Sequence, residues 1–287
     1  MIKPAVFSPS ATEAWSRCPW KWWLEREGWR DSRLEKKDVA ALMGEAFTLA
    51  LSHYNRVVRD RGWEAARAKE QHPHYIDAAL ALFDQSVQHA LDNGQSFADE
   101  ALLAEAPVVL RTTLPKFIAD DPTPTTYEVV AIEEPRPEHG WSRCDVVYLR
   151  PDGTIEVVDY KLKKALDARY VAETLEEYQE GAQRWHYTWA ENAARVSFYV
   201  AVSAPFRVLH VPCDRDEARL AQWLESQRPK WTLMQRQLDG EMPLWEADQH
   251  KDKWGWCPFK EPCLVHGRDR GRMAASGFVQ IKRGRRG

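Results

Sequence analysis

Two aspartates and a lysine near the middle of the chain are residue types that suit metal-assisted hydrolysis of a phosphodiester. Asp145 begins one apolar run, and Asp159 and Lys161 close the next one. Side chains alternate across a β-strand, so Asp159 and Lys161 share one face while Tyr160 points to the other. Carboxylate oxygens are the ligands that Mg²⁺ and Mn²⁺ prefer. The two aspartates could therefore bind such an ion, while the lysine orients a water or adds positive charge beside the transition state.

The turn between the two runs decides whether the carboxylates can meet. Its sequence, Arg150-Pro-Asp-Gly153, has the proline and glycine positions of a type I turn, which predicts a hairpin. In a three-residue loop with Gly153 in the left-handed conformation, Asp145 lies opposite Asp159. A two-residue loop would set Asp145 opposite Tyr160, on the wrong face. The turn residues favour the register in which both carboxylates reach one ion.

Asp-x-Lys alone is a weak pattern, because such charges usually lie on a solvated sheet face. The segments Gly140-Trp-Ser-Arg-Cys-Asp145 and Val157-Val-Asp-Tyr-Lys161, however, resemble the PD-(D/E)XK nuclease superfamily. The resemblance is to its RecB-like exonuclease branch, which includes CRISPR-associated iron-sulfur exonucleases. The glycine is displaced by one position from its commonest spacing in that branch. The resemblance implies that Asp145, Asp159 and Lys161 are catalytic and that the two aspartates bind the metal.

The same branch carries a Gln-x-x-x-Tyr motif on the next helix, and this chain has Gln183-Arg-Trp-His-Tyr187. A spacing of four puts both side chains on one helical face. The resemblance implies that Gln183 and Tyr187 position the substrate. An amphipathic helix with Tyr178, Trp185 and Trp189 in a core would explain the aromatic residues but not Gln183.

An earlier helix departs from the pattern of the family. Members usually have Gly-x-x-x-His there, with a histidine that binds metal, and the corresponding stretch here is Gly44-Glu-Ala-Phe-Thr48. Threonine is a poor direct ligand. Glu45 can reach the same general face as Thr48, whereas His53 lies more than a turn beyond it. Glu45 is therefore the candidate replacement ligand, and a solvated helix-surface glutamate is the alternative.

The cysteines suggest a second metal site. The cluster-bearing RecB-like nucleases hold a four-iron, four-sulfur cluster with one cysteine before the core and three after it. Here Cys18, Cys257 and Cys263 fit that pattern, and Trp254 stands where the other cysteine is expected. His266 could complete a set of three cysteines and one histidine, suited to zinc or to an atypical [4Fe-4S] cluster. The alternative is a degenerate site whose cysteines are buried small hydrophobes.

The chain of 287 residues has five cysteines, no apolar stretch long enough to span a membrane and no signal peptide. These features predict a cytoplasmic protein without a disulfide framework or a membrane partner. The net charge of −3 does not by itself indicate DNA binding. Positive charge gathers in the tail after Arg268 and in a second group at Lys161, Lys163, Lys164 and Arg169. Either group could bind phosphates, and a tail that only aids solubility is the alternative.

Hydrophobic periodicity and breakers predict an α/β protein in which helices are followed by three strands, a helix and further strands. The resemblance implies that this order is a restriction-endonuclease-like αβββαβ core with a mixed central sheet, an N-terminal helical insertion and a C-terminal cysteine-containing segment. A first helix begins after a Ser or Thr cap near Ser8. Further helices are expected at 39–59, 76–93, 99–118, 172–192 and 214–238, and strands at 128–133, 144–149, 155–162, 196–202 and 207–211. We divide the chain into a helical region with Cys18 (1–120), a nuclease core (121–240), a cysteine segment (241–267) and a basic tail (268–287).

These expectations lead to a metal-dependent DNA exonuclease that acts on DNA ends or single strands in recombination, repair or processing. A structure-specific or restriction-type endonuclease of the same fold is one alternative. A catalytically inactive protein that binds DNA ends is another, and Thr48 and Trp254 are the residues that favour it.

Overall fold

The structure is a computed structural model that describes residues 7–26, 29–31, 36–136, 139, 142–164, 168–241, 251–252, 255–256 and 278–280. Trp254, Cys257, Cys263 and His266 lie outside the described residues, and so does most of the basic tail. The described helices are α1 (Pro9–Arg17), α2 (Pro19–Arg26), α3 (Val39–Arg61), α4 (Trp63–Arg67), α5 (His72–Asp92), α6 (Glu100–Ala119), α7 (Ala168–Glu180), α8 (Ala182–Ala190) and α9 (Glu217–Leu238), with a 3₁₀ turn at Lys69–Gln71.

A five-stranded mixed sheet lies at the centre of the fold. Its order is β10-β9-β8-β7-β4, and the β8–β9 pair is parallel while the other pairs are antiparallel. The strands are β4 (Glu128–Ile132), β7 (Val146–Leu149), β8 (Ile155–Lys163), β9 (Arg195–Ser203) and β10 (Phe206–Asp214). The predicted α/β class with a mixed central sheet is confirmed.

Among the described residues, four short two-stranded pairs accompany the central sheet. They are β1 (Trp29–Asp31) with β13 (Phe278–Gln280), β2 (Lys36–Lys37) with β3 (Ser96–Phe97), β5 (Pro135–Arg136) with β6 (Ser142–Arg143), and β11 (Lys251–Asp252) with β12 (Gly255–Trp256). The β1–β13 pair joins segments from the two ends of the sequence.

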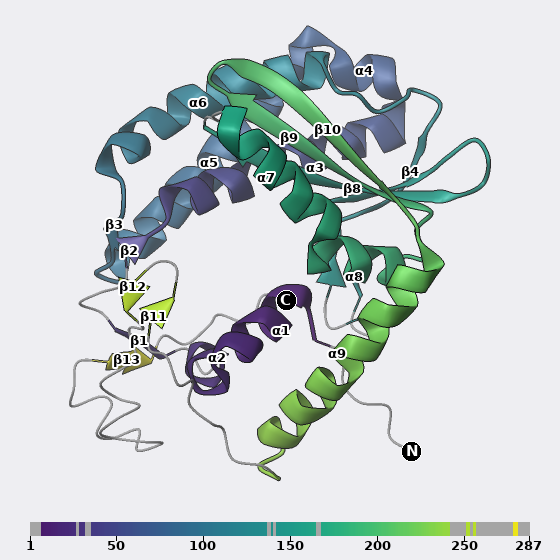
Figure 1. The fold of residues 1–287 in the computed structure, drawn as a ribbon. Coiled ribbons are helices and arrows are strands. Elements are labelled where there is room, and N and C mark those ends of the chain that lie inside the picture. Colours follow the sequence, from purple (N-terminus) through teal and green to yellow (C-terminus); the bar gives the residue numbers. More distant parts are fainter. Residues whose placement is uncertain are drawn as a thin grey trace.

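The sheet is covered on both faces, as Figure 1 shows for α7 on one side and α3, α5 and α6 on the other. Phe47 of α3 and Leu110 of α6 belong to the same hydrophobic cluster as Tyr160 of β8. The opposite face carries a second cluster, which includes Phe198 of β9 and Tyr187 of α8. Tyr199, which follows Phe198 on β9, belongs to the first cluster, so successive residues of one strand enter different cores, as strand alternation requires. The helical region shares its core with one face of the sheet.

Local signals explain where the first helices begin. Ser8 caps α1 by accepting a hydrogen bond from the Ala11 amide, and Pro9 takes the first helical position, where a missing N–H costs nothing. Asp38 caps α3 in the same way, by accepting from the amides of Ala40 and Ala41. The predicted start of the first helix near Ser8 is confirmed.

The single helix predicted at 172–192 is wrong, because two helices, α7 and α8, meet at Gly181. Gly181 is extended, with φ −66° and ψ 150°, and forms the N-cap of α8. A Cβ added there would lie 2.4 Å from the Glu177 carbonyl oxygen, so no larger residue fits without a shift. The break changes the direction of the chain just before the Gln183-x-x-x-Tyr187 segment.

Tryptophan side chains join the first helices to α9. The Trp15 indole N–H donates to Gln237 Oε1 at 2.6 Å, and the Trp231 indole N–H donates to Thr12 Oγ1 at 3.1 Å. Trp22 lies in the same buried cluster. These tryptophans pack in the core between the first helices and α9, where each large ring buries much apolar surface.

Candidate active site

The hairpin of β7 and β8 has the register that the turn residues predict. Val146 pairs with Val158 and Leu149 with Ile155, so the same register carried one residue further sets Asp145 opposite Asp159. The loop is the three-residue kind, because Gly153 has φ 80° and the Arg150 N–H donates to the Thr154 carbonyl at 2.9 Å.

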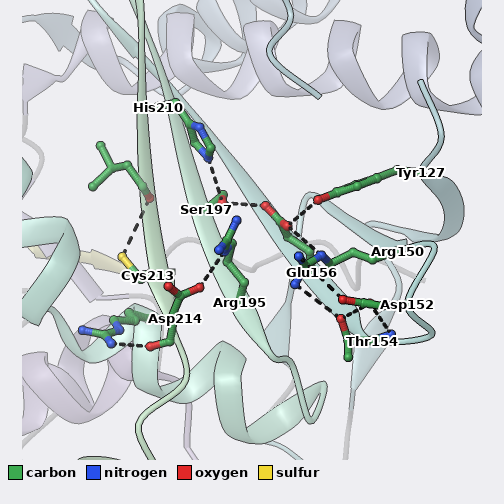
Figure 2. Close-up of polar contacts among 12 residues, drawn as sticks. Tyr127, Arg150, Asp152, Thr154, Glu156, Arg195, Ser197, His210, Cys213 and Asp214 are labelled. Atoms are coloured by element: carbon green, nitrogen blue, oxygen red, sulfur yellow. Dashed lines mark hydrogen bonds and ion pairs between the residues drawn. The ribbon is translucent and has the colours of Figure 1, made fainter. Parts of the chain in front are cut away.

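Asp152 stabilises this turn from within. Its Oδ1 accepts from the Thr154 amide at 3.0 Å and from the Thr154 hydroxyl at 2.6 Å (Figure 2). An aspartate side chain that accepts a hydrogen bond from the backbone amide two residues later forms an Asx turn. The register that brings the two carboxylates together is therefore fixed by local turn chemistry.

The three predicted catalytic side chains lie together. Lys161 Nζ forms an ion pair with Asp159 Oδ2 at 2.5 Å, and the Tyr160 amide donates to Asp145 Oδ2 at 2.7 Å. Asp159 is 2% exposed. The carboxylates and the lysine thus occupy one space on the α7–α8 side of the sheet.

Burial and then the charge of Asp159 raise the pKa of Asp145 well above its usual value. Burial works to lower the pKa of Lys161, but the charge and hydrogen bond of Asp159, aided by Asp145, raise it above its usual value. The lysine is therefore a cation at neutral pH. The two carboxylates repel one another, and a positive charge between them would relieve that repulsion.

Gln183 and Tyr187 share one face of α8, as their spacing predicts, and both reach Asp159. Gln183 Nε2 donates to Asp159 Oδ1 at 2.9 Å and to the Tyr187 hydroxyl at 2.8 Å. The Tyr187 hydroxyl lies 3.2 Å from Asp159 Oδ1 and 3.2 Å from the Arg143 carbonyl oxygen. The two side chains fix the orientation of the Asp159 carboxylate.

A triangle of polar groups holds the hairpin from the opposite face of the sheet. Asn55 of α3 donates to the Tyr160 hydroxyl at 3.0 Å and accepts from the Tyr148 hydroxyl at 2.7 Å. The two hydroxyls lie 3.3 Å apart, and Asn55 is fully buried. Tyr148 and Tyr160 belong to β7 and β8, so Asn55 ties both strands of the carboxylate hairpin to one helix.

A cavity of about 920 Å³ opens on the α8 side of the sheet, where Gln183 and Tyr187 contact Asp159. Gln183 and Tyr187 form part of its wall, next to the stacked pair of Tyr178 and Phe198. Other lining residues come from the start of α1 and from the β4, β5 and β6 region, namely Ser8, Pro9, Ser10, Glu13, Glu133, Pro135 and Arg143. A cavity with convergent polar groups is where a substrate is expected to bind.

The sequence model of the PD-(D/E)XK nuclease superfamily matches residues 6–264. The chain belongs to this superfamily. It is therefore a nuclease, a hydrolase of phosphodiester bonds whose substrate is nucleic acid. No curated protein matches the chain. A solved structure described as "Crystal structure of SSO0001" aligns with 68% of this chain and 76% of its own at 11% identity, with a TM-score of 0.24, too low to show a shared fold.

PD-(D/E)XK nucleases generally use divalent metals, and the carboxylate pair of this one suits such an ion. Asp145 and Asp159 offer oxygen ligands whose mutual repulsion an ion would offset. Within the described ranges, no group of three or more His, Cys, Asp or Glu residues is arranged to hold a metal. Mg²⁺ is usually coordinated by one or two carboxylates, with water and substrate phosphate as its other ligands, and the aspartate pair fits this coordination.

Helix α3, which was expected to supply a further metal ligand, does not place Glu45 at the cavity of this nuclease. Glu45 is exposed on α3, and Thr48 is half-buried with its carbonyl oxygen accepting from Ser52. His53 is also half-buried; burial and then the charge of Arg56 lower its pKa, and Glu133 opposes them. Neither Glu45 nor Thr48 is among the described residues that line the cavity.

Glu133 lines the cavity of this nuclease and was not among the site residues predicted from the sequence. It follows β4 in a left-handed conformation with φ 49°, and its amide donates to the carbonyl oxygens of Cys144 and Asp145. Its charge contributes to the raised pKa of Asp145. Glu133 ends the strand predicted at 128–133, which pairs with β7, and this position was the one sequence signal for it. A register shift between Val129 and Ala131 prevented a prediction of which β7 residue it would lie beside.

Of the predicted cysteine site of this nuclease, only Cys18 lies within the described residues. It is buried between α1 and α2. Trp29–Asp31 pairs with Phe278–Gln280, so segments from the two ends of the sequence do come together. The ligand set of Cys18, Cys257, Cys263 and His266 stays a prediction.

A second polar cluster lies on the α3 and α6 side of the sheet and contains a serine, a histidine and a carboxylate. The Ser197 hydroxyl donates to Glu156 at 2.6 Å and lies 3.1 Å from His210 Nε2 (Figure 2). A hydrolytic triad places the histidine between the serine and the acid, whereas here the serine is in the middle. Ser197 is fully buried, so the cluster joins β8, β9 and β10 and offers no accessible nucleophile.

Proposed function

We propose that this nuclease is a metal-dependent DNA exonuclease of the RecB-like branch, which acts on DNA ends or single strands. The observation that carries the proposal is the hairpin that sets Asp145 opposite Asp159, with Lys161 ion-paired to Asp159. In this proposal Asp145 and Asp159 bind Mg²⁺ or Mn²⁺. A bound divalent ion supplies polarisation of the phosphate and a water of lowered pKa.

The side chains around the carboxylates would have separate roles. Lys161 keeps a positive charge next to the reacting phosphate and can orient the attacking water. Gln183 and Tyr187 position Asp159 through Oδ1 and also line the cavity, so they can contact the substrate. Glu45 stays a candidate metal ligand only if α3 shifts, because its side chain is exposed.

The test is cleavage of end-labelled linear DNA and of covalently closed circular DNA with Mg²⁺ or Mn²⁺. We expect the linear substrate to be degraded from its ends and the closed circle to survive. Asp159→Ala and Lys161→Ala should each lose cleavage, while Asp84→Ala, at an exposed position of α5 outside the cavity wall, should keep it. Cleavage that persists in both site variants would refute the site, and a cut circle would indicate an endonuclease. A protein that binds DNA ends without metal-dependent cleavage would be the inactive alternative.

We also propose that Cys18, Cys257, Cys263 and His266 bind a [4Fe-4S] cluster or zinc. The pairing of β1 with β13 supports this, because it brings the two ends of the sequence together. Anaerobically purified protein should show visible absorption for iron-sulfur, or bound zinc without colour. Cys257→Ala should lose that metal and the buried Cys213→Ala should retain it. Protein free of iron and zinc would refute the proposal.

A further inference from the structure

The described residues that line the cavity carry more negative than positive charge. Glu13, Glu133 and Glu177 line it, and among the described lining residues Arg143 alone carries a positive charge. Lys161 is nearby, but its ammonium group is paired with Asp159. A DNA phosphate that enters the cavity would therefore meet three carboxylates and one guanidinium.

The backbone of Arg143 is fixed by contacts with neighbouring elements, while its side chain is exposed and can reach a ligand. Its carbonyl oxygen lies 3.2 Å from the Tyr187 hydroxyl, and its backbone pairs with Pro135. The side chain is 52% exposed. Its ion-pair partner in the described part of the chain is Glu133, whose oxygen lies 3.9 Å from the guanidinium, beyond hydrogen-bond distance. A guanidinium has five donors in a fixed fork, a geometry that matches two phosphate oxygens.

The position of Arg143 also fits the candidate chemistry. It precedes Asp145 by two residues, and Tyr187 contacts both the Arg143 carbonyl and the Asp159 carboxylate. The neighbouring wall, formed by Tyr178 and Phe198, is aromatic. A phosphate near the two aspartates therefore has Arg143 as its cationic neighbour on the cavity wall.

We propose that Arg143 binds a backbone phosphate of the DNA strand in the cavity, and that Glu133 competes with that phosphate for the guanidinium. The proposal rests on the proposed nuclease site and adds a substrate-binding residue to it. Arg143 recognises the charge and geometry of phosphate, so it contributes affinity without base preference. Its loss should act mainly on KM, with a smaller effect on kcat.

The experiment measures binding of a short end-labelled DNA strand by fluorescence anisotropy in Ca²⁺, over a range of salt concentrations, with a gel to check that the strand stays intact. Arg143→Ala should weaken binding by about tenfold, as expected for loss of a charge-assisted contact. The slope of log K against log salt should fall by about 0.7, the value for one phosphate contact on a single strand. A duplex arm of the assay shows whether the contact also forms with paired DNA.

Three further variants separate a phosphate contact from a structural role. Arg143→Lys should keep the salt slope and recover part of the affinity, which a loss of packing would not do. Glu133→Gln should tighten binding, because it frees the guanidinium and removes a negative charge. Arg59→Ala is the matched control, since Arg59 is 45% exposed, pairs with the adjacent Asp60 and is not part of the cavity wall.

Equal affinity and equal salt slope for Arg143→Ala and Arg59→Ala would overturn the role of Arg143. That outcome differs from failure of the proposed function, in which the wild-type protein binds DNA but does not cut it with Mg²⁺ or Mn²⁺. Circular dichroism of each variant checks the fold. If Arg143→Ala does not fold, Arg143→Gln gives the same comparison with the stem of the side chain retained.

Discussion

Replacement of Asn55 with alanine tests whether the triangle behind the sheet holds the carboxylate hairpin. The substitution removes the donor to the Tyr160 hydroxyl and the acceptor of the Tyr148 hydroxyl. Each buried hydroxyl left without its partner costs about 1–3 kcal/mol, and the two hydroxyls keep only their mutual contact at 3.3 Å. We expect the free energy of unfolding to fall by about 3 kcal/mol.

The measurement is urea denaturation followed by circular dichroism, arranged as a double-mutant cycle with Tyr160→Phe. Because the two groups share a hydrogen bond, the double variant should be less destabilised than the sum of the single variants, with a coupling energy of about 1 kcal/mol. Asn93→Ala is the matched control, since Asn93 is exposed and its amide donates to the His89 carbonyl. Its effect should stay within about 0.5 kcal/mol.

Asn55→Ala should also weaken binding of Mn²⁺, measured by calorimetry. The reason is that β8 is anchored through the Tyr160 hydroxyl, and the Tyr160 amide donates to Asp145 Oδ2. Weaker binding in protein that is still folded separates positioning from stability alone. Additive single variants, or an Asn55→Ala protein as stable as Asn93→Ala, would show that the triangle does not act as described.

Two other predictions follow from the helix α8. Burial lowers the pKa of His186 from 6.5 to about 4, so unfolding takes up a proton and the free energy of unfolding should decrease as pH falls from about 6.5 to about 4. The full loss is about 3 kcal/mol, measured by urea denaturation at several pH values; His186→Gln should flatten the profile, and an unchanged profile would contradict the prediction. Gln183→Ala should lower metal affinity by about tenfold, because Asp159 loses an orienting donor. Calorimetry with Mn²⁺ checks this, with Gln179→Ala on α7 as the control, and equal affinity in Gln183→Ala and Gln179→Ala would count against it.

The hairpin could be predicted because its determinants are local. The Pro, Asp and Gly of the turn set the loop, the loop sets the register, and strand alternation then places Asp159 and Lys161 together. The shared helical face of Gln183 and Tyr187 followed from their spacing in the same way, whereas their role came from the resemblance to the family. Both inferences needed only residues that lie within a few positions of one another.

Features that depend on distant contacts could not be predicted in this way. A glycine within a helical pattern is often tolerated, so Gly181 did not reveal that Glu177 approaches it. Asn55 meets Tyr160 across 105 positions of sequence, and nothing local marks it as a partner. Glu133 aligns with the site only after the irregularity between Val129 and Ala131. These positions are set by tertiary packing.

The hydrogen bond between Trp15 and Gln237 spans 222 positions of sequence and has a consequence for the order of folding. The start of α1 forms part of the cavity wall, and α1 packs on α9. During synthesis the ribosome releases α1 first, yet its packing surface does not exist until α9 has emerged. The β7–β8 hairpin can form well before that. The nuclease therefore completes its cavity wall as a late event of biogenesis, and a nascent chain that stops before α9 would carry the carboxylates without that wall.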